Sequence, residues 1–175
     1  MRFDADYIET LTLSDGQQCT VRCIKPEDRD VLRDGMARYS ADSLYWRFLS
    51  VKKELSEAEL DYLTQVDGHD HFALVAGRVF ADGSRQGMAV GRFVRLTEWP
   101  DEADFALFVG DPFQSLGLGR AMFDRLVEAA REREIRVLVG EMFAGNTKMF
   151  ALVERSGLPV DWRIDGPLAV CRIAI

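Results

Sequence analysis

The sequence is poor in the residues that hold metals and disulfides. Its 175 residues include two histidines and three cysteines. The cysteines, Cys19, Cys23 and Cys171, form no C-x-x-C pair, and the histidines are His69 and His71. This spacing matches neither a zinc site nor a disulfide framework. We therefore expect no metal, and thiols that pack as small apolar groups in a reducing compartment.

The sequence also lacks an excess of basic residues, a membrane-length apolar run and a secretion signal. It has 22 Lys and Arg against 29 Asp and Glu, a net charge of −7. That balance argues against a nucleic-acid partner and suits a cationic one. No stretch approaches the roughly 20 apolar residues that span a bilayer, and the N-terminus has no basic-then-apolar signal pattern. We expect a cytoplasmic protein with no membrane partner.

Length and periodicity predict a single α+β domain over residues 1–175. Alternating apolar positions predict strands over 8–13, 19–24, 71–79, 88–96, 103–109, 135–139 and 168–175. Capping and helical-period signals predict helices from 26, over 40–48, from 56, over 118–133 and over 146–154. This order indicates a mostly antiparallel sheet with one strand–helix–strand crossover.

A glycine-rich turn before the helix at 118–133 carries the clearest functional signal. Gly117 and Gly119 lack a Cβ, so their amides can approach a bound group. A helix start offers unpaired N–H groups and a positive dipole end, which favour a pyrophosphate, and Arg120 would add charge. Met122 replaces the third glycine of a Rossmann turn, and the Gly-Lys-Ser/Thr of a P-loop is absent. From glycine spacing alone, a turn with no ligand fits equally well.

The residues around this turn resemble the GNAT superfamily of N-acetyltransferases. The run from Gln114 to Gly119 is similar to the Q-x-x-G-x-G signature of that family, the run from Asn146 to Gly157 to its asparagine-led helix, and the run from Val21 to Asp28 to its first strand and helix start. Residues 45–48, 55–57 and 66–76 look like the catalytic domain of bacterial GNAT protein lysine acetyltransferases. The resemblance implies a GNAT fold, a mixed, mostly antiparallel twisted sheet flanked by helices. In this fold two splayed strands, here 103–109 and 135–139, form the acetyl-CoA cleft.

The resemblance also implies which residues hold acetyl-CoA. The backbone of Phe108 and Val109 would bind the pantetheine, and Gln114 belongs to the signature. The backbone amides around the pyrophosphate would come from Leu116, Gly117, Leu118, Gly119 and Arg120. Asn146 would lie near the cofactor, although a plain N-cap role explains it equally well.

A carboxylate is the expected catalytic group, because a lysine amine with a pKa of about 10.4 must lose a proton before it attacks. The family often places a glutamate ten or so residues before the signature glutamine, and Asp104 stands there in this chain. Glu102 is a rival on the same strand face. The tyrosine that often serves as the acid is replaced by Val153.

The predicted function is therefore acetyl transfer from acetyl-CoA directly to a primary amine, leaning to a protein lysine. A small polycationic amine, such as an aminoglycoside or a polyamine, is the alternative acceptor, and a non-catalytic acyl-CoA-binding module is the second alternative. The resemblance allows a homodimer, but no surface in the sequence specifies one. Aromatic residues that either line the acceptor side or belong to the core are Tyr39, Tyr45, Trp46, Phe48 and Trp99.

Overall fold

The computed structural model describes residues 1–38 and 54–175. An eight-stranded mixed sheet has the order β1-β2-β3-β4-β5-β6-β8-β7. Its strands are β1 (Ile8–Thr12), β2 (Gln18–Cys23), β3 (His71–Val79), β4 (Arg85–Arg95), β5 (Glu102–Val109), β6 (Val137–Phe143), β7 (Val160–Asp165) and β8 (Leu168–Ala174). All neighbours pair antiparallel except β5 and β6, which are parallel. The α+β class and the single crossover are confirmed.

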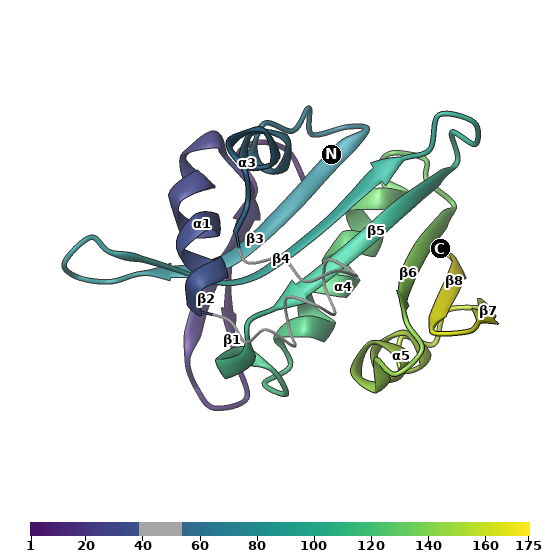
Figure 1. Cartoon of the computed structure of the whole chain (residues 1–175). Helices are drawn as coiled ribbons and strands as arrows, with labels where there is room; N and C mark the ends of the chain where they lie inside the picture. Colours follow the sequence, from purple (N-terminus) through teal and green to yellow (C-terminus); the bar gives the residue numbers. More distant parts are fainter. Residues whose placement is uncertain (39–53) are drawn as a thin grey trace.

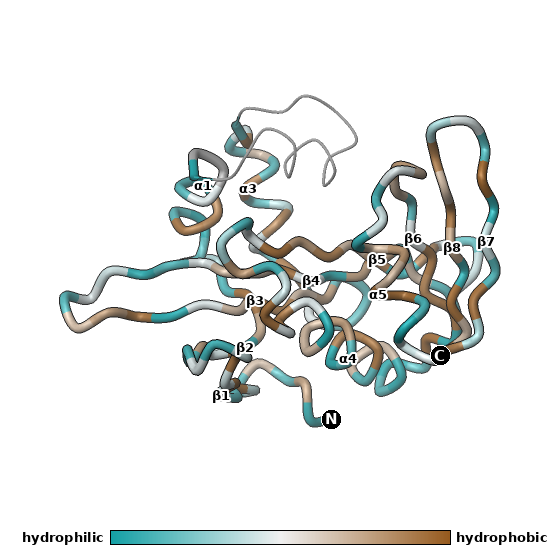
Figure 2. The backbone as a smooth tube through the Cα atoms, turned by 90° about the horizontal axis from the view of Figure 1, so that it is seen from below, coloured by the Kyte–Doolittle hydropathy of each residue, from teal (hydrophilic) through white to brown (hydrophobic). Residues whose placement is uncertain are grey.

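Helices cover both faces of this sheet. They are α1 (Arg29–Arg38), α3 (Glu57–Thr64), α4 (Leu118–Arg131) and α5 (Thr147–Glu154), with short 3-10 turns η1 (Pro26–Asp28) and η2 (Asp111–Phe113). Figure 1 shows α1 and α3 in front of the sheet and α4 behind it, and Figure 2 shows the same separation from below. In the described part of the chain, no helix has the length and apolar character to cross a bilayer.

The crossover helix α4 holds the largest part of the core. Its buried residues face β3, β4 and β5 and comprise Leu118, Met122, Phe123, Leu126, Val127, Ala129 and Ala130. On β5, alternate residues Ala103, Phe105 and Leu107 are buried in the same cluster. This alternation is what aims the remaining β5 side chains, including Asp104, at the opposite face.

Several local predictions are confirmed. Ser56 and Glu59 form the expected capping box at the start of α3, with Ser56 Oγ accepting from the Glu59 N–H at 3.3 Å. Asn146 caps α5 through a 3.2 Å bond from the Met149 N–H. Gly157 follows α5 with a left-handed φ of 74°.

Other boundaries differ from the prediction. The segment after Lys25 begins as the 3-10 turn η1 before α1 continues it, and β4 begins at Arg85 instead of residue 88. β6 covers Val137–Phe143 instead of 135–139, and the edge strand β7 was not predicted. The predicted helix at 40–48, with Tyr39, Tyr45, Trp46 and Phe48, lies outside the described residues. Trp99 is described and is 56% exposed.

Candidate active site

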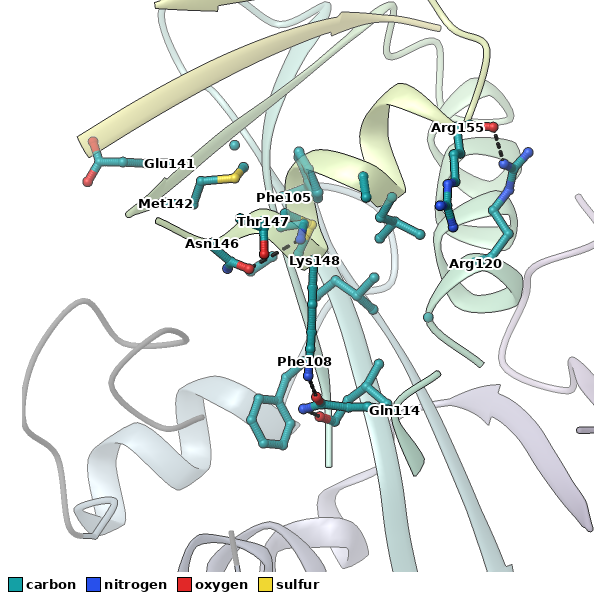
Figure 3. A pocket seen from close by; sticks show the side chains of 18 of the residues that line it. Phe105, Phe108, Gln114, Arg120, Glu141, Met142, Asn146, Thr147, Lys148 and Arg155 are labelled. Atoms are coloured by element: carbon teal, nitrogen blue, oxygen red, sulfur yellow. Dashed lines mark hydrogen bonds between the residues drawn. The ribbon is translucent and has the colours of Figure 1, made fainter. Parts of the chain in front are cut away.

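The site forms where the two parallel strands part. β5 and β6 share three residue pairs, the last of which joins Asp104 to Val139. Beyond it β5 continues to Val109 beside β4, and β6 continues to Phe143 beside β8. A cleft of about 1340 Å³ opens between them, bounded by the glycine turn before α4 and by the start of α5. The predicted splayed pair is thus present, and Figure 3 shows the cleft from close by.

Gly140 sets how closely β5 and β6 approach at the start of the splay. A Cβ on this residue would lie 2.5 Å from the Phe105 ring and 3.0 Å from the Cys171 sulfur. Both neighbours are buried, so glycine is required for the ring to fill this position. Phe105 follows Asp104 directly on β5, so the packing of the Phe105 ring also fixes the backbone that carries Asp104.

The turn before α4 is ready to hold an anion. Gly117 caps the helix in the left-handed region, with φ 85° and ψ −11°, and Ser115 is also left-handed at φ 62°. The first turn of α4 contains no acidic residue, so its unpaired N–H groups face no competing carboxylate. A Cβ on Gly119 would be in ordinary contact with Val109 at 3.6 Å. The left-handed backbone conformation therefore requires a glycine at Gly117, whereas a Cβ would fit at Gly119.

Gln114 joins the two walls of the cleft. Its side-chain Nε2 donates to the Val109 carbonyl at the end of β5 at 3.0 Å, and its Oε1 accepts from Lys148 Nζ on α5 at 2.5 Å. Figure 3 shows Lys148 reaching down across the cleft to Gln114. An amide is the side chain that can serve both neighbours, because it carries a donor and an acceptor.

Two arginines line the cleft beside the start of α4. Arg120 donates to Asp124 at 2.7 Å and to the Arg155 carbonyl at the end of α5. The Arg155 guanidinium is exposed and forms no ion pair within residues 1–38 and 54–175. Figure 3 shows the two side chains next to each other. Together with Lys148 they make this end of the cleft cationic, although the sequence analysis had singled out neither Lys148 nor Arg155.

The two candidate bases have different surroundings. Asp104 lines the cleft, and no ion pair or side-chain hydrogen bond reaches it from the part of the chain that the structure describes. Partial burial raises the pKa of the Asp104 carboxyl. Glu102 lies outside the cleft lining, and one of its oxygens accepts from Arg172 on β8. The other Glu102 oxygen is buried with no partner among the described residues.

The predicted cofactor residues divide into two groups. Leu116 and Leu118 do not line the cleft with their side chains, because Leu118 is fully buried and Leu116 packs against the core. Those that do line it are Phe108, Val109, Gln114, Gly117, Gly119, Arg120 and Asn146. Their contacts with acetyl-CoA remain predictions. Glu141 on β6 also lines the cleft and was not predicted.

Other residues weighed from the sequence lie away from the reacting centre or in the core. Val153 is fully buried. Burial raises the pKa of the Cys19, Cys23 and Cys171 thiols, that of Cys171 to about 11, which disfavours a nucleophilic thiolate. His71 Nε2 lies 3.0 Å from the Arg92 guanidinium, and burial lowers the pKa of the His71 imidazole. In the described ranges no three His, Cys, Asp or Glu residues are grouped to hold a metal.

The geometry defines a class of protein. A parallel strand pair that parts beside a glycine turn and a helix start is the arrangement the GNAT resemblance implied. The sequence profile of the acetyltransferase (GNAT) family matches residues 38–158. The chain belongs to this family and is an acetyltransferase.

Two individual acetyltransferases are similar in sequence to this chain. The chain is 30% identical over 138 residues to "Acetyltransferase PA5475" of Pseudomonas aeruginosa, covering 79% of this chain and 73% of that protein. It is 31% identical over 147 residues to "Acetyltransferase Pat" of Mycolicibacterium smegmatis, covering 81% of this chain and 41% of Pat.

Solved structures agree with this result. The GNAT domain of S. lividans PAT superposes with a TM-score of 0.87 at 26% identity, and each chain covers 99% of the other. A cAMP-binding acyltransferase from Mycobacterium smegmatis gives 0.63 at 25% identity, over 96% of this chain and 47% of that one. The chain therefore spans less than half the length of these mycobacterial proteins and nearly the whole of the S. lividans GNAT domain.

Proposed function

We propose that the chain transfers an acetyl group from acetyl-CoA directly to the side-chain amine of a protein lysine. The observation that carries the proposal is Asp104, a carboxylate without a partner among the described residues, held in the cleft where β5 and β6 part. The lysine acceptor is supported by the sequence resemblance to bacterial protein lysine acetyltransferases and by the likeness to Pat and to the S. lividans PAT domain.

The cleft suits the three parts of acetyl-CoA. The N–H groups at the start of α4, with Arg120, would bind the pyrophosphate. Beyond Asp104 the edge of β5 no longer pairs with β6, and its backbone would offer donors and acceptors to the pantetheine amides. Asn146 has its Oδ1 engaged in the α5 cap, which leaves its Nδ2 for a ligand carbonyl. Acetyl-CoA supplies an activated acyl group on a thioester.

Asp104 would act as the general base. It accepts a proton from the acceptor ammonium, directly or through one water, and the freed nitrogen lone pair forms the C–N bond as the C–S bond breaks. The electron pair of the C–S bond leaves on sulfur as a thiolate, whose thiol has a pKa of about 8.5. The nitrogen then carries one proton more than the amide product, and this proton passes, directly or through water, to the thiolate. Val153 occupies the place of the family's tyrosine and is buried, so that position provides no proton to the thiolate.

Two matched amide substitutions test the base. We expect D104N to lower kcat/KM for a lysine peptide by about 10²–10⁴-fold, the usual contribution of a general base. E102Q keeps an acceptor for Arg172 and should retain most activity. Unchanged binding of acetyl-CoA in both variants, measured by calorimetry, would show that the cleft is intact. Full activity in D104N would reject Asp104 as the base.

The acceptor is tested separately with a panel of amines. Lysine peptides, intact acyl-CoA synthetases, polyamines and aminoglycosides are incubated with acetyl-CoA and analysed by mass spectrometry. Acetylated lysine is the expected product. Acetylation of only the polyamine or aminoglycoside would replace the protein acceptor by a small polycationic amine. That alternative is supported by the net charge of −7 and by the carboxylates of Asp104 and Glu141 in the cleft.

A further inference from the structure

Glu141 and Asp104 both line the cleft, one on each of the two strands that part. On β6 the residues Leu138, Gly140 and Met142 are buried, so alternation directs Glu141 to the other face of the sheet. Val139 lies on that same face and is paired with Asp104. Asp104 and Glu141 therefore project from the same side of the sheet, one from each wall. Figure 3 shows Glu141 pointing away from α4, to the side where the Phe108 ring lies.

Glu141 differs from the other glutamates of the sheet in having no ion pair in the described part of the chain. The described strands contain three glutamates. Glu9 is paired with Arg125, and Glu102 with Arg172. Glu141 is exposed, its cross-strand neighbour on β8 is Val170, and residues 1–38 and 54–175 provide it with no ion pair. A bare carboxylate on an otherwise apolar strand wall is a ready partner for a ligand cation.

The face of the sheet to which Glu141 projects assigns it to the acceptor instead of to the phosphates of acetyl-CoA. The cationic and helix-terminal groups that suit phosphates, Arg120, Lys148 and Arg155, gather at the α4 end of the cleft. Strand residues advance by about 3.3 Å each, so Glu141 lies roughly 7 Å beyond the last β5–β6 pair. It lies beside the stretch where β5 and β6 part, and its side chain points away from α4 and from the turn that suits the phosphates.

We infer that Glu141 is the carboxylate that binds the acceptor ammonium and sets the preference for a cationic amine. The inference rests on the proposed function. A lysine amine arrives protonated at neutral pH, and Glu141 pairs with it at the mouth of the cleft. Asp104 then takes the proton at the acetyl group. Glu141 is an acceptor-binding residue in this scheme, and Asp104 remains the base.

The test is a kinetic comparison of E141Q with D104N. We expect E141Q to raise KM for a lysine peptide at least about tenfold, the loss of one charge-assisted contact, with kcat within about threefold of the wild type. D104N should lower kcat. E134Q removes the same charge at an exposed glutamate in the turn after α4, outside the cleft, and should change neither constant. Calorimetry with acetyl-CoA should give the same Kd for all of these proteins.

A second acceptor separates recognition of charge from a general effect of the substitution. In a peptide whose lysine is replaced by a side chain ending in an aminooxy group, the nucleophile is uncharged at neutral pH. E141Q should acetylate this peptide with the KM of the wild type. An unchanged KM for the lysine peptide in E141Q would overturn the inference. So would a loss of kcat in E141Q with an intact D104N, because Glu141 would then be the base.

Failure of the proposed function has a different signature. In that case the wild type acetylates neither peptide and E141Q cannot lower any affinity, so both conclusions fall together. If the wild type acetylates both peptides and only the KM shift is missing, the proposed function stands and the role of Glu141 is rejected.

Discussion

Substituting Gly140 by alanine tests how the core sets the geometry of the cleft. The new Cβ would lie 2.5 Å and 2.9 Å from two ring carbons of Phe105 and 3.0 Å from the Cys171 sulfur. Neither neighbour can swing into solvent, because both are buried. Overpacking of this kind costs roughly 1–3 kcal/mol, and replacing a strand glycine returns roughly 0.5–1 kcal/mol. We expect a net loss of about 1 kcal/mol in the free energy of unfolding.

The assay is thermal unfolding of G140A beside a matched glycine variant. For a chain of this size 1 kcal/mol shifts Tm by roughly 2–4 °C, so G140A should melt about 2–4 °C below the wild type. Gly91 is also a buried strand glycine, but its Cβ would meet only side-chain ends, the nearest being Leu107 at 3.4 Å. G91A should stay within about 1 kcal/mol of the wild type.

The two variants should also differ in activity. Phe105 must move to admit a Cβ at Gly140, and Asp104 precedes it on β5, so G140A should lower kcat even at a temperature where it is fully folded. A Tm for G140A equal to or above that of G91A would refute the packing argument. A wild-type kcat in G140A would refute the link from the core to the base.

Three further outcomes follow from the charges. Because burial raises the pKa of Asp104, the acidic limb of kcat/KM should lie above the ordinary aspartate value of about 3.9, and D104N should lose that limb. R155Q should weaken CoA binding about tenfold and leave the affinity for dephospho-CoA unchanged, because the exposed Arg155 guanidinium would contact a phosphate beyond the pyrophosphate. Equal weakening of the binding of both ligands would contradict this. Arg125 lowers the pKa of Glu9 to about 2, so the stability that this pair contributes is present above about pH 4.5 and is lost as the pH falls toward 2. Urea titrations of wild type and E9Q across that window should converge at low pH.

The sequence predicted those parts of the fold that depend on local chemistry. The capping pair Ser56 and Glu59, the left-handed Gly117 and the α4 face were all readable, because a single backbone conformation or period determines each. β7 was missed although Val160, Trp162 and Ile164 alternate with charged residues. As an edge strand that pairs only with β8, it has the half-exposed alternation that also fits a loop.

Most of the predicted residues that line the cleft lie on one wall. The glycine turn and the family resemblance predicted Gln114, Gly117, Gly119, Arg120 and Asp104, which line the cleft, and their roles stay predictions. Glu141 escaped because the predicted strand stopped at residue 139, where Gly140 interrupts the apolar run. Lys148 and Arg155 come from α5, and only the three-dimensional packing of α5 against the α4 turn brings them to the cleft. No local signal carries that information.

We expect the three-pair contact between β5 and β6 to govern how the two parts of the sheet move. It divides the sheet into a five-stranded leaf, β1 to β5, and a three-stranded leaf, β6, β8 and β7, hinged along a short seam. A pantetheine chain lying between the leaves would act as a missing strand and lock the hinge. Amides on the inner edges beyond the seam should then exchange hydrogen fastest in the free protein and slow together when CoA is added. At a hundred times its Kd the ligand would stabilise the whole sheet by about 2.7 kcal/mol.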